Sequence, residues 1–358
     1  VDWRRSFITT QANPFYDSFI RWQFNTLRTR GKVLFGKRAS VYSPLDGQQV
    51  CADHDRASGE GVGPQEYTIV KLRVLELKGK LSPLQGMDVF LGPATLRPET
   101  MYGQTNCFVL PEGKYGAYRM VGGDVLIISE RAAKGLSYQD QVAVTGQPDC
   151  VLGGLMGSDL LGLPLKAPNA VYDVVYTLPL PTISMGKGTG VVTSVPSDAP
   201  DDYAALKELQ DKPAWRQKFG ITDEMVMPFE VVPIIEIPGY GDRSAQVMCE
   251  RLKIVSCKDA EKLRRAKEEV YLKGFYEGVM LVGPCKGYKV CDAKPKIRAE
   301  LIARGDAMPY LEPESLVMSR SGEECVVALT DQWFLPYGEE GWRDEVMAHV
   351  DSPTFNGY

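Results

Sequence analysis

The chain is poor in histidine and lacks the motifs of the common hydrolases. Only His54 and His349 occur in 358 residues, and no G-x-S-x-G string is present. A Ser-His-Asp triad needs a histidine general base beside its nucleophile, so this class of hydrolase is disfavoured. No apolar run approaches the roughly 18 residues that a membrane helix requires, so we expect no membrane partner.

The sequence also lacks the paired metal ligands of zinc sites. Its eight cysteines form no C-x-x-C, and the spacing of Cys285 and Cys291 matches no zinc motif. Cys51 and His54 could offer two ligands, but no second pair accompanies them. We therefore expect no metal site, and we expect reduced thiols in a reducing compartment.

What the chain does contain is the composition of a folded globular protein without a strong charge bias. Hydrophobic residues make up 44% and charged residues 24%, and the net charge is −5. This composition excludes a disordered tail. A nucleic acid would have to be bound at a local site, because binding along many phosphates needs a basic surface. The chain begins at Val1 without a leader, so we expect a piece of something longer.

Strands are predicted for the middle of the chain and helices for its two ends. Between Asn13 and Gly31, a cap, an early proline and a terminal glycine predict an amphipathic helix whose aromatic stripe packs into a core. Polar, glycine-rich residues 43–64 predict a connector and a domain boundary. Strands are expected at 68–76, 89–91, 125–128, 171–176 and 190–195, and late helices at 245–252, 259–273 and 294–303. This pattern favours an α+β, β-rich fold, a barrel with peripheral helices, over a doubly wound sheet.

Two segments carry candidate chemistry. Residues 94–103 (A-T-L-R-P-E-T-M-Y-G) place two threonines around an Arg-Pro turn, where hydroxyls can bind a carbonyl, a water or a ribose oxygen and Arg97 can hold an anion. Residues 188–203 (G-T-G-V-V-T-S-V-P-S-D-A-P-D-D-Y) join a glycine pair, a strand and an acidic helix start. Taken singly, a strand-end turn and a helix capped by Ser197 or Asp198 explain them more simply.

Taken together, the two segments closely resemble the editing domain of eukaryotic cytosolic leucyl-tRNA synthetases, which are class I enzymes. The W-T-T-x-P-x-T wording of the isoleucyl and valyl enzymes is absent. The HIGH and KMSKS motifs of the synthetic site are also absent, so this piece is not expected to activate leucine. Further segments similar to the same family extend the resemblance over nearly the whole chain: residues 1–7, 54–56, 59–67, 272–278, 318–321 and 331–333.

The resemblance implies a domain organisation and an activity. Residues 61–318 would be the editing domain, with a central β-barrel, and residues 1–60 and 319–358 would be edges of the catalytic domain. The activity would be hydrolysis of the ester that joins isoleucine, valine, norvaline or methionine to the terminal adenosine of tRNA(Leu), since a hydrophobic pocket separates such amino acids by only about 1–3 kcal/mol. No metal or cofactor is expected for editing, and ATP and magnesium would serve only the full-length enzyme. The expected partners are the tRNA end and the rest of the synthetase, in the cytoplasm, with the protein as a monomer.

The resemblance also assigns roles to individual residues. The two expected catalytic residues are Asp202, which matches the aspartate that holds the α-ammonium group, and Thr95, which matches the threonine that binds the attacking water or the carbonyl oxygen. Thr100 matches the threonine whose methyl group blocks the leucine side chain. Arg97 is expected to touch the terminal nucleotide. The remaining expected substrate-binding residues are Leu96, Lys187, Thr193 and Val195.

At two positions this sequence differs from the bacterial members of the family, and each difference changes the role expected there. Leu96 replaces a threonine, so oxyanion or ribose contacts at this point are expected to come from backbone N–H groups. Asp198 replaces a histidine and is given no role, and Asp201 is expected to point elsewhere as a helix-start charge. The implied mechanism is attack by a positioned water without a covalent intermediate. Two alternatives stay open: a module that binds the tRNA end with little hydrolysis, and a fragment that only offers a small-molecule pocket.

Overall fold

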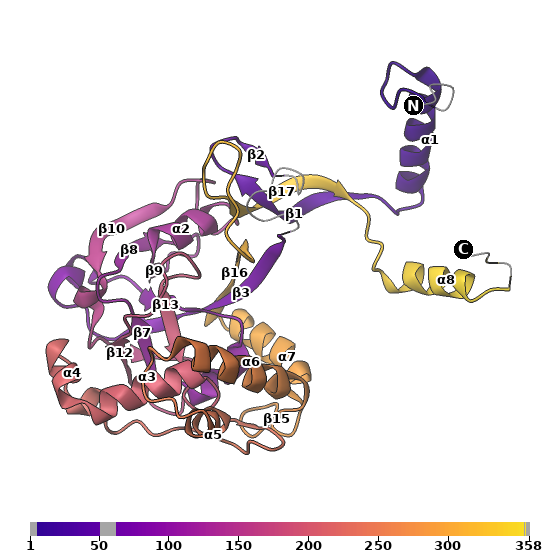
Figure 1. The fold of residues 1–358 in the computed structure, drawn as a ribbon. Coiled ribbons are helices and arrows are strands. Elements are labelled where there is room, and N and C mark those ends of the chain that lie inside the picture. The colour runs from indigo at the N-terminus through magenta and orange to yellow at the C-terminus, as the bar shows by residue number, and fades with distance from the viewer. Residues whose placement is uncertain (1–5, 51–61, 354, 356–358) are drawn as a thin grey trace. The chain divides into compact units, whose positions relative to one another are not determined.

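The computed structural model describes residues 6–50, 62–353 and 355 (Figure 1). Two compact units result from its contacts, one formed by the chain ends up to Ser40 and from Leu329, and one from Val41 to Ala328. The boundary falls within two strands, β1 (Leu34–Ser43) and β17 (Val326–Phe334). The domain boundaries predicted near residues 60 and 318 stay predictions. The conceivable metal ligands Cys51 and His54 lie outside the described residues.

The terminal unit contains two helices, α1 (Pro14–Thr29) and α8 (Glu340–Val350). The predicted cap of α1 is confirmed, because the Asn13 side chain accepts hydrogen bonds from the first backbone N–H groups of the helix. The predicted burial of its aromatic stripe is wrong: no residue of α1 is buried. Phe24 meets Trp333 edge-on at 5.2 Å between ring centroids. Two helices and two strand ends supply too little apolar surface to enclose the stripe.

The central unit is built on a nine-stranded mixed sheet with strand order β10-β8-β9-β5-β4-β11-β12-β7-β13. Two neighbouring pairs are parallel, β5 with β9 and β12 with β7. A mixed, β-rich α/β class is therefore confirmed. The order of the described strands ends at β10 and β13 without closing, so the barrel stays a prediction. The nine strands are β4 (Leu72–Val74), β5 (Val89–Leu91), β7 (Asn106–Val109), β8 (Lys114–Arg119), β9 (Val125–Ile128), β10 (Asp149–Met156), β11 (Pro164–Lys166), β12 (Val175–Pro179) and β13 (Val191–Ser194).

Smaller sheets and six helices complete the central unit. A second sheet has the order β16-β3-β6, β14 pairs with β15, and β2 pairs with β1. The strands are β2 (Gln48–Gln49), β3 (Pro64–Val70), β6 (Ala94–Thr95), β14 (Ile235–Glu236), β15 (Val279–Met280) and β16 (Ala307–Pro313). The helices are α2 (Glu130–Ser137), α3 (Pro200–Asp211), α4 (Pro213–Lys218), α5 (Ser244–Arg251), α6 (Ala260–Tyr276) and α7 (Val290–Ala303).

Buried strands form where short apolar runs predicted them, and one predicted strand is divided. Residues 125–128 and 89–91 are β9 and β5. The alternating residues of 68–76 predict a half-buried strand. The structure divides this segment between β3 and β4, and the prediction is wrong at the end of β3, where consecutive residues are buried. The reason is that both faces are covered there, since Ile69 belongs to one apolar cluster and Val70 to another. The strand predicted at 171–176 forms later, as β12, where it pairs with β7.

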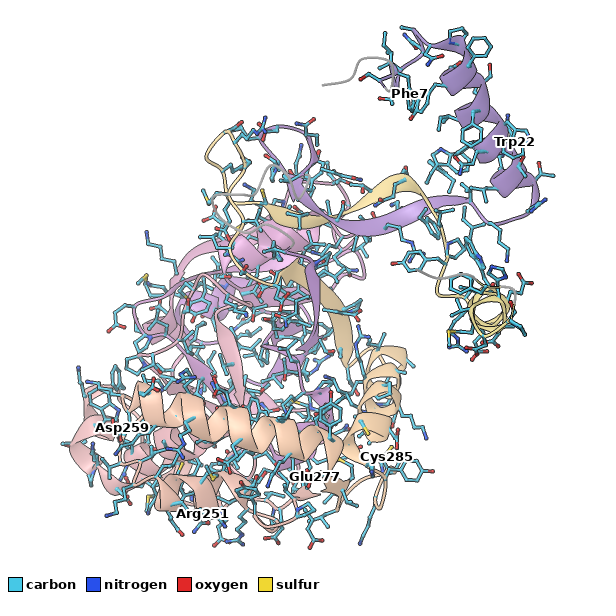
Figure 2. All side chains as sticks on the ribbon, turned by 45° about the vertical axis from the view of Figure 1, so that its right-hand side comes forward. Phe7, Trp22, Arg251, Asp259, Glu277 and Cys285 are labelled. Atoms are coloured by element: carbon cyan, nitrogen blue, oxygen red, sulfur yellow. The ribbon has the colours of Figure 1, made fainter. Side chains whose placement is uncertain are left out.

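Helices α3, α5, α6 and α7 lie together at one end of the central unit (Figure 1). The predicted late helices correspond to α5, α6 and α7, and Figure 2 shows α6 as one continuous helix between the labels of Asp259 and Glu277. Helix α3 packs Leu206 and Leu209 against Phe108 of β7. Burial of each such side chain stabilises the fold by roughly 1.5–3 kcal/mol. This packing fixes the start of α3 beside the end of β13.

Residues 6–50, 62–353 and 355 were searched for membrane-spanning helices, disulfides and clusters of metal ligands, and none was found among them. No helix there has the length and apolar character needed to cross a bilayer. No disulfide joins the cysteines there, and no three acidic, cysteine or histidine side chains gather as metal ligands would.

Candidate functional site

A cavity of about 350 Å³ in the central unit brings together most of the predicted site residues. Its walls come from β6 and the turn after it, from the strand β13, from the start of α3 and from α6. Exposed Lys187 is not part of the lining, but it precedes Gly188, which is next to the lining residue Ala94. The predicted residues that do line the cavity are Thr95, Leu96, Arg97, Thr100, Thr193, Val195 and Asp202.

Thr95 is held at the end of a short strand by both backbone and side-chain contacts. It is opposite Thr68 in the pairing of β6 with β3. Its hydroxyl oxygen accepts a hydrogen bond from the Arg97 N–H at 3.0 Å, which tightens the turn. Pro98 then begins a 3-10 helix that runs to Gly103. A hydroxyl that accepts from the backbone keeps its own proton to donate, so Thr95 can donate to an oxygen atom in the cavity.

The hydroxyl of Thr100 is engaged by the backbone. Its Oγ1 donates to the Arg97 carbonyl at 2.8 Å, and its backbone N–H donates to the same oxygen at 3.0 Å. The residue is only 3% exposed and lines the cavity. With the hydroxyl committed to the turn, the methyl group is the part of Thr100 that is left to contact a ligand.

Arg97 lines the cavity with a guanidinium group that has partners within the protein. Its carbon lies 4.5 Å from the centroid of the Tyr271 ring, and its Nε is 3.6 Å from Glu99 Oε1. Burial opposes the charge, but Asp198 and Glu99 outweigh it and raise the pKa of Arg97 above its usual value. The guanidinium is therefore fixed and always charged. Its predicted contact with a terminal nucleotide stays a prediction.

Two buried carboxyl groups accompany Arg97. Glu99 and Asp198 are each 1% exposed, and burial raises the pKa of both, although Arg97 acts in the opposite direction. The predicted capping of α3 by Ser197 or Asp198 is wrong, because the N-cap is Ala199, whose side chain makes no capping bond. The reason is that the Ser197 hydroxyl donates instead to Asp198 Oδ2 at 2.6 Å, inside the protein.

Asp202 is a buried carboxyl group at the cavity wall. Its Oδ2 accepts a hydrogen bond from the Val195 N–H at 2.8 Å, and the side chain's other oxygen has no hydrogen-bond partner among the described residues. Burial raises the pKa of Asp202 to about 7, while the Val195 N–H lowers it and the neighbouring Asp201 raises it. Asp201 itself pairs with Lys267 of α6 at 2.8 Å. An unpaired oxygen on a buried acid can bind a cation from the cavity.

The raised pKa of Asp202 makes a prediction about stability. The native carboxyl holds its proton up to about pH 7, whereas the unfolded value is 3.8, so native stability declines as the pH rises between these values. We expect Asp202→Asn, which has no charge to bury, to gain stability over the wild type across this range, by up to about 4 kcal/mol at pH 8. Urea unfolding at pH 5 and pH 8 measures this difference. A difference independent of pH would contradict it.

Sequence reasoning missed the residues that α6 adds to the cavity. Lys267 and Tyr271 are one helical turn apart and both line it. Their i, i+4 spacing in a predicted helix indicated a shared face. Nothing in the sequence indicated that this face meets the turn at Arg97, because that contact depends on how distant elements pack.

The arrangement suits binding and positioning of a ligand with a positive group. The cavity offers an acid with an unpaired oxygen, a threonine hydroxyl that can donate, and a threonine methyl group. None of the described residues that line it is a histidine. Chemistry here would rest on placing a water molecule against a reactive bond.

Comparisons with curated proteins found close relatives over nearly the whole chain. It is 59% identical over 346 residues to "Leucine--tRNA ligase, cytoplasmic" of Pongo abelii, covering 96% of this chain and 29% of that protein. It is 56% identical over 343 residues to the Arabidopsis thaliana protein of the same name, with 96% of this chain and 31% of that protein covered. The chain thus spans less than a third of the length of these two relatives. No family model matches the sequence.

Two solved structures share the fold, and the second is named an editing domain. The structure named GlLeuRS-CP1 has a TM-score of 0.64 and 38% identity, covering 69% of this chain and 99% of that one. The editing domain of the P. knowlesi cytosolic leucyl-tRNA synthetase has a TM-score of 0.63 and 27% identity, covering 69% of this chain and 96% of that one.

Proposed function

The chain belongs to the leucyl-tRNA synthetase family, and we propose that its cavity is a post-transfer editing site. The substrate is tRNA(Leu) that carries isoleucine, valine, norvaline or methionine on its 3′ terminal adenosine, and the products are the free amino acid and the tRNA. The relatives are named cytoplasmic, and we assign this activity to the cytoplasm. The observation that carries the proposal is the buried acid Asp202, which has one oxygen unpaired in the same cavity as Thr95 and Thr100.

Asp202 binds the α-ammonium group of the misattached amino acid. The Val195 N–H orients the carboxylate through Oδ2, which leaves the other oxygen for the ligand. A charge-assisted hydrogen bond in a buried site is among the stronger polar contacts, and it fixes where the ester carbonyl lies. A bound ammonium group also favours the ionised acid, which burial otherwise disfavours.

Hydrolysis then needs only a positioned water. The water oxygen attacks the ester carbonyl carbon, the bond to the ribose oxygen breaks, and the ribose oxygen takes up the proton that the water loses. The Thr95 hydroxyl, which accepts from the Arg97 N–H, donates to the water or to the carbonyl oxygen. Holding the reactants in place supplies most of the catalysis, which suits a cavity whose described lining residues include no histidine. No metal or cofactor takes part in this scheme.

Leucine is excluded by shape. The methyl group of Thr100 occupies the space that a leucine side chain needs, and its hydroxyl bond to the Arg97 carbonyl prevents it from rotating away. Leu96, Thr193 and Val195 complete the wall around the amino acid, and Arg97 contacts the terminal nucleotide. The physiological partners are the tRNA(Leu) end and the rest of the synthetase, the protein acts as a monomer, and ATP and magnesium serve only the full-length enzyme.

The test is the rate at which the chain removes isoleucine from labelled isoleucyl-tRNA(Leu). We expect ester loss well above the uncatalysed rate, little loss from leucyl-tRNA(Leu), and unchanged rates in EDTA, because the proposed chemistry uses no metal. Loss of activity in EDTA that zinc restores would contradict the metal-free mechanism. Binding of the tRNA without ester loss would instead support the alternative function as a docking module.

A further inference from the structure

The glycine-rich loop at residues 186–190 is held from outside the cavity by three separate elements. The Gly188 N–H donates to both carboxylate oxygens of Glu312 in β16, at 3.0 Å each. The Ser129 N–H donates to the Thr189 carbonyl at 2.9 Å. The Tyr115 hydroxyl donates to the Gly190 carbonyl at 2.6 Å. Three consecutive residues of the loop are therefore fixed.

Glu312 is the charged member of these contacts, and it is buried. Glu312 is only 2% exposed. Arg131 of α2 pairs with it at 2.9 Å between Nη1 and Oε2, and the Tyr310 hydroxyl donates to the same oxygen at 3.3 Å. Arg131 pairs in turn with Glu324 at 2.5 Å. A buried carboxylate is unfavourable unless its oxygens are satisfied, so its two bonds to one backbone N–H hold that N–H in a defined place.

The loop fixed in this way borders the cavity. Gly188 has a φ of +62°, and a Cβ built on it would lie 3.9 Å from the Cβ of Ala94, which lines the cavity. Three residues after Gly188 the chain reaches β13, which carries Thr193 of the cavity wall. Lys187 immediately precedes Gly188 and is exposed. The backbone position of Lys187 therefore depends on where Glu312 holds the N–H of the next residue, beside the lining residue Ala94.

We propose that Glu312 is a positioning residue that sets Lys187 at the rim to bind a backbone phosphate of the RNA 3′ end. This rests on the proposed function, because an aminoacyl-tRNA brings its terminal phosphates past the rim as its ester enters the cavity. Lys187 supplies the charge, and Glu312 acts through the Gly188 N–H without touching the RNA. A cation fixed by its backbone loses less conformational freedom on binding than one on a free loop.

The test compares Glu312→Gln and Lys187→Ala, singly and combined, in tRNA(Leu) binding and isoleucyl-tRNA(Leu) hydrolysis. We expect each single variant to raise KM and Kd by about tenfold with little change in kcat. The double variant should bind the tRNA no more weakly than either single variant, because both substitutions remove the same contact. Each should also reduce the salt dependence of log Kd by about 0.7, the value of one phosphate contact to a single strand. Glu324→Gln, which removes the other carboxylate of Arg131, and Lys134→Gln, which removes a partly buried cation of α2 that pairs with Glu323, are the controls and should change neither quantity.

The outcomes separate the two proposals. If the wild type hydrolyses the ester but the effects of Glu312→Gln and Lys187→Ala add, the positioning role is wrong. If the wild type does not hydrolyse it, the proposed function fails, while the salt dependence of tRNA binding still tests the Lys187 contact. Should Glu312→Gln not fold, Tyr310→Phe removes one bond to the same carboxylate and should shift Kd in the same direction, about twofold. An unchanged salt dependence in Lys187→Ala overturns the inference.

Discussion

Replacing Asp202 with alanine is expected to abolish hydrolysis of isoleucyl-tRNA(Leu) and to leave the chain folded. The substitution removes the proposed partner of the ammonium group, so the ester carbonyl is no longer held against the water. We expect a loss of about 100-fold or more in kcat/KM, because misplacing the reacting atoms by an ångström costs about that much. The fold should survive, since burying the charged acid is itself unfavourable.

Two further variants isolate the charge of Asp202 from its contacts. Asp202→Asn keeps an oxygen that can accept from the Val195 N–H but has no charge for the ammonium group, so it should be nearly as inactive as alanine. Asp201→Ala, which loses the ion pair with Lys267 in the cavity wall, should retain most activity. Single-turnover deacylation measures all of them, with circular dichroism as the check on folding. Wild-type rates in Asp202→Ala would show that the carboxylate is only a helix-start charge.

Substitution of Thr100 is expected to change which amino acid is removed. Thr100→Ala deletes the blocking methyl group and should make leucyl-tRNA(Leu) a substrate, with a gain of about 10–200-fold relative to isoleucyl-tRNA(Leu), the range of one or two methyl-sized groups. Thr100→Tyr should fill the cavity and suppress hydrolysis of every aminoacyl ester. The ratio of the leucyl and isoleucyl rates is the quantity to measure.

Two conservative variants separate the shape of Thr100 from its hydrogen bond. Thr100→Ser keeps a hydroxyl for the Arg97 carbonyl and loses the methyl group, so it should admit leucine as alanine does. Thr100→Val keeps the bulk and loses the hydroxyl, so it should still reject leucine although the turn is weakened. If valine admits leucine and serine does not, Thr100 acts through the turn and steric exclusion is the wrong explanation.

Local features of the fold could be predicted because they depend on neighbouring residues. The cap at Asn13 needs only the N–H groups that follow it, and the buried strand at 125–128 is an uninterrupted apolar run. The division of the strand at 68–76 could not be predicted, because β3 and β4 pair with strands of two different sheets. The aromatic stripe of α1 has the pattern of a buried face, but no residue of α1 is buried, although Phe24 contacts Trp333.

The features of the candidate site also separate into those that depend on neighbouring residues and those that depend on distant ones. The order of residue types in the segments 94–103 and 188–203 was enough to identify the family and to select Thr95, Thr100 and Asp202. Only the tertiary structure decided that Asp202 is a buried acid with one oxygen unpaired, and that Asp198 turns inward and does not cap α3. Burial and charge pairing depend on contacts between elements that are remote in the chain, as when Glu312 holds the loop at Gly188 from 124 residues away. No local pattern records such a contact, because it arises only when the elements pack together.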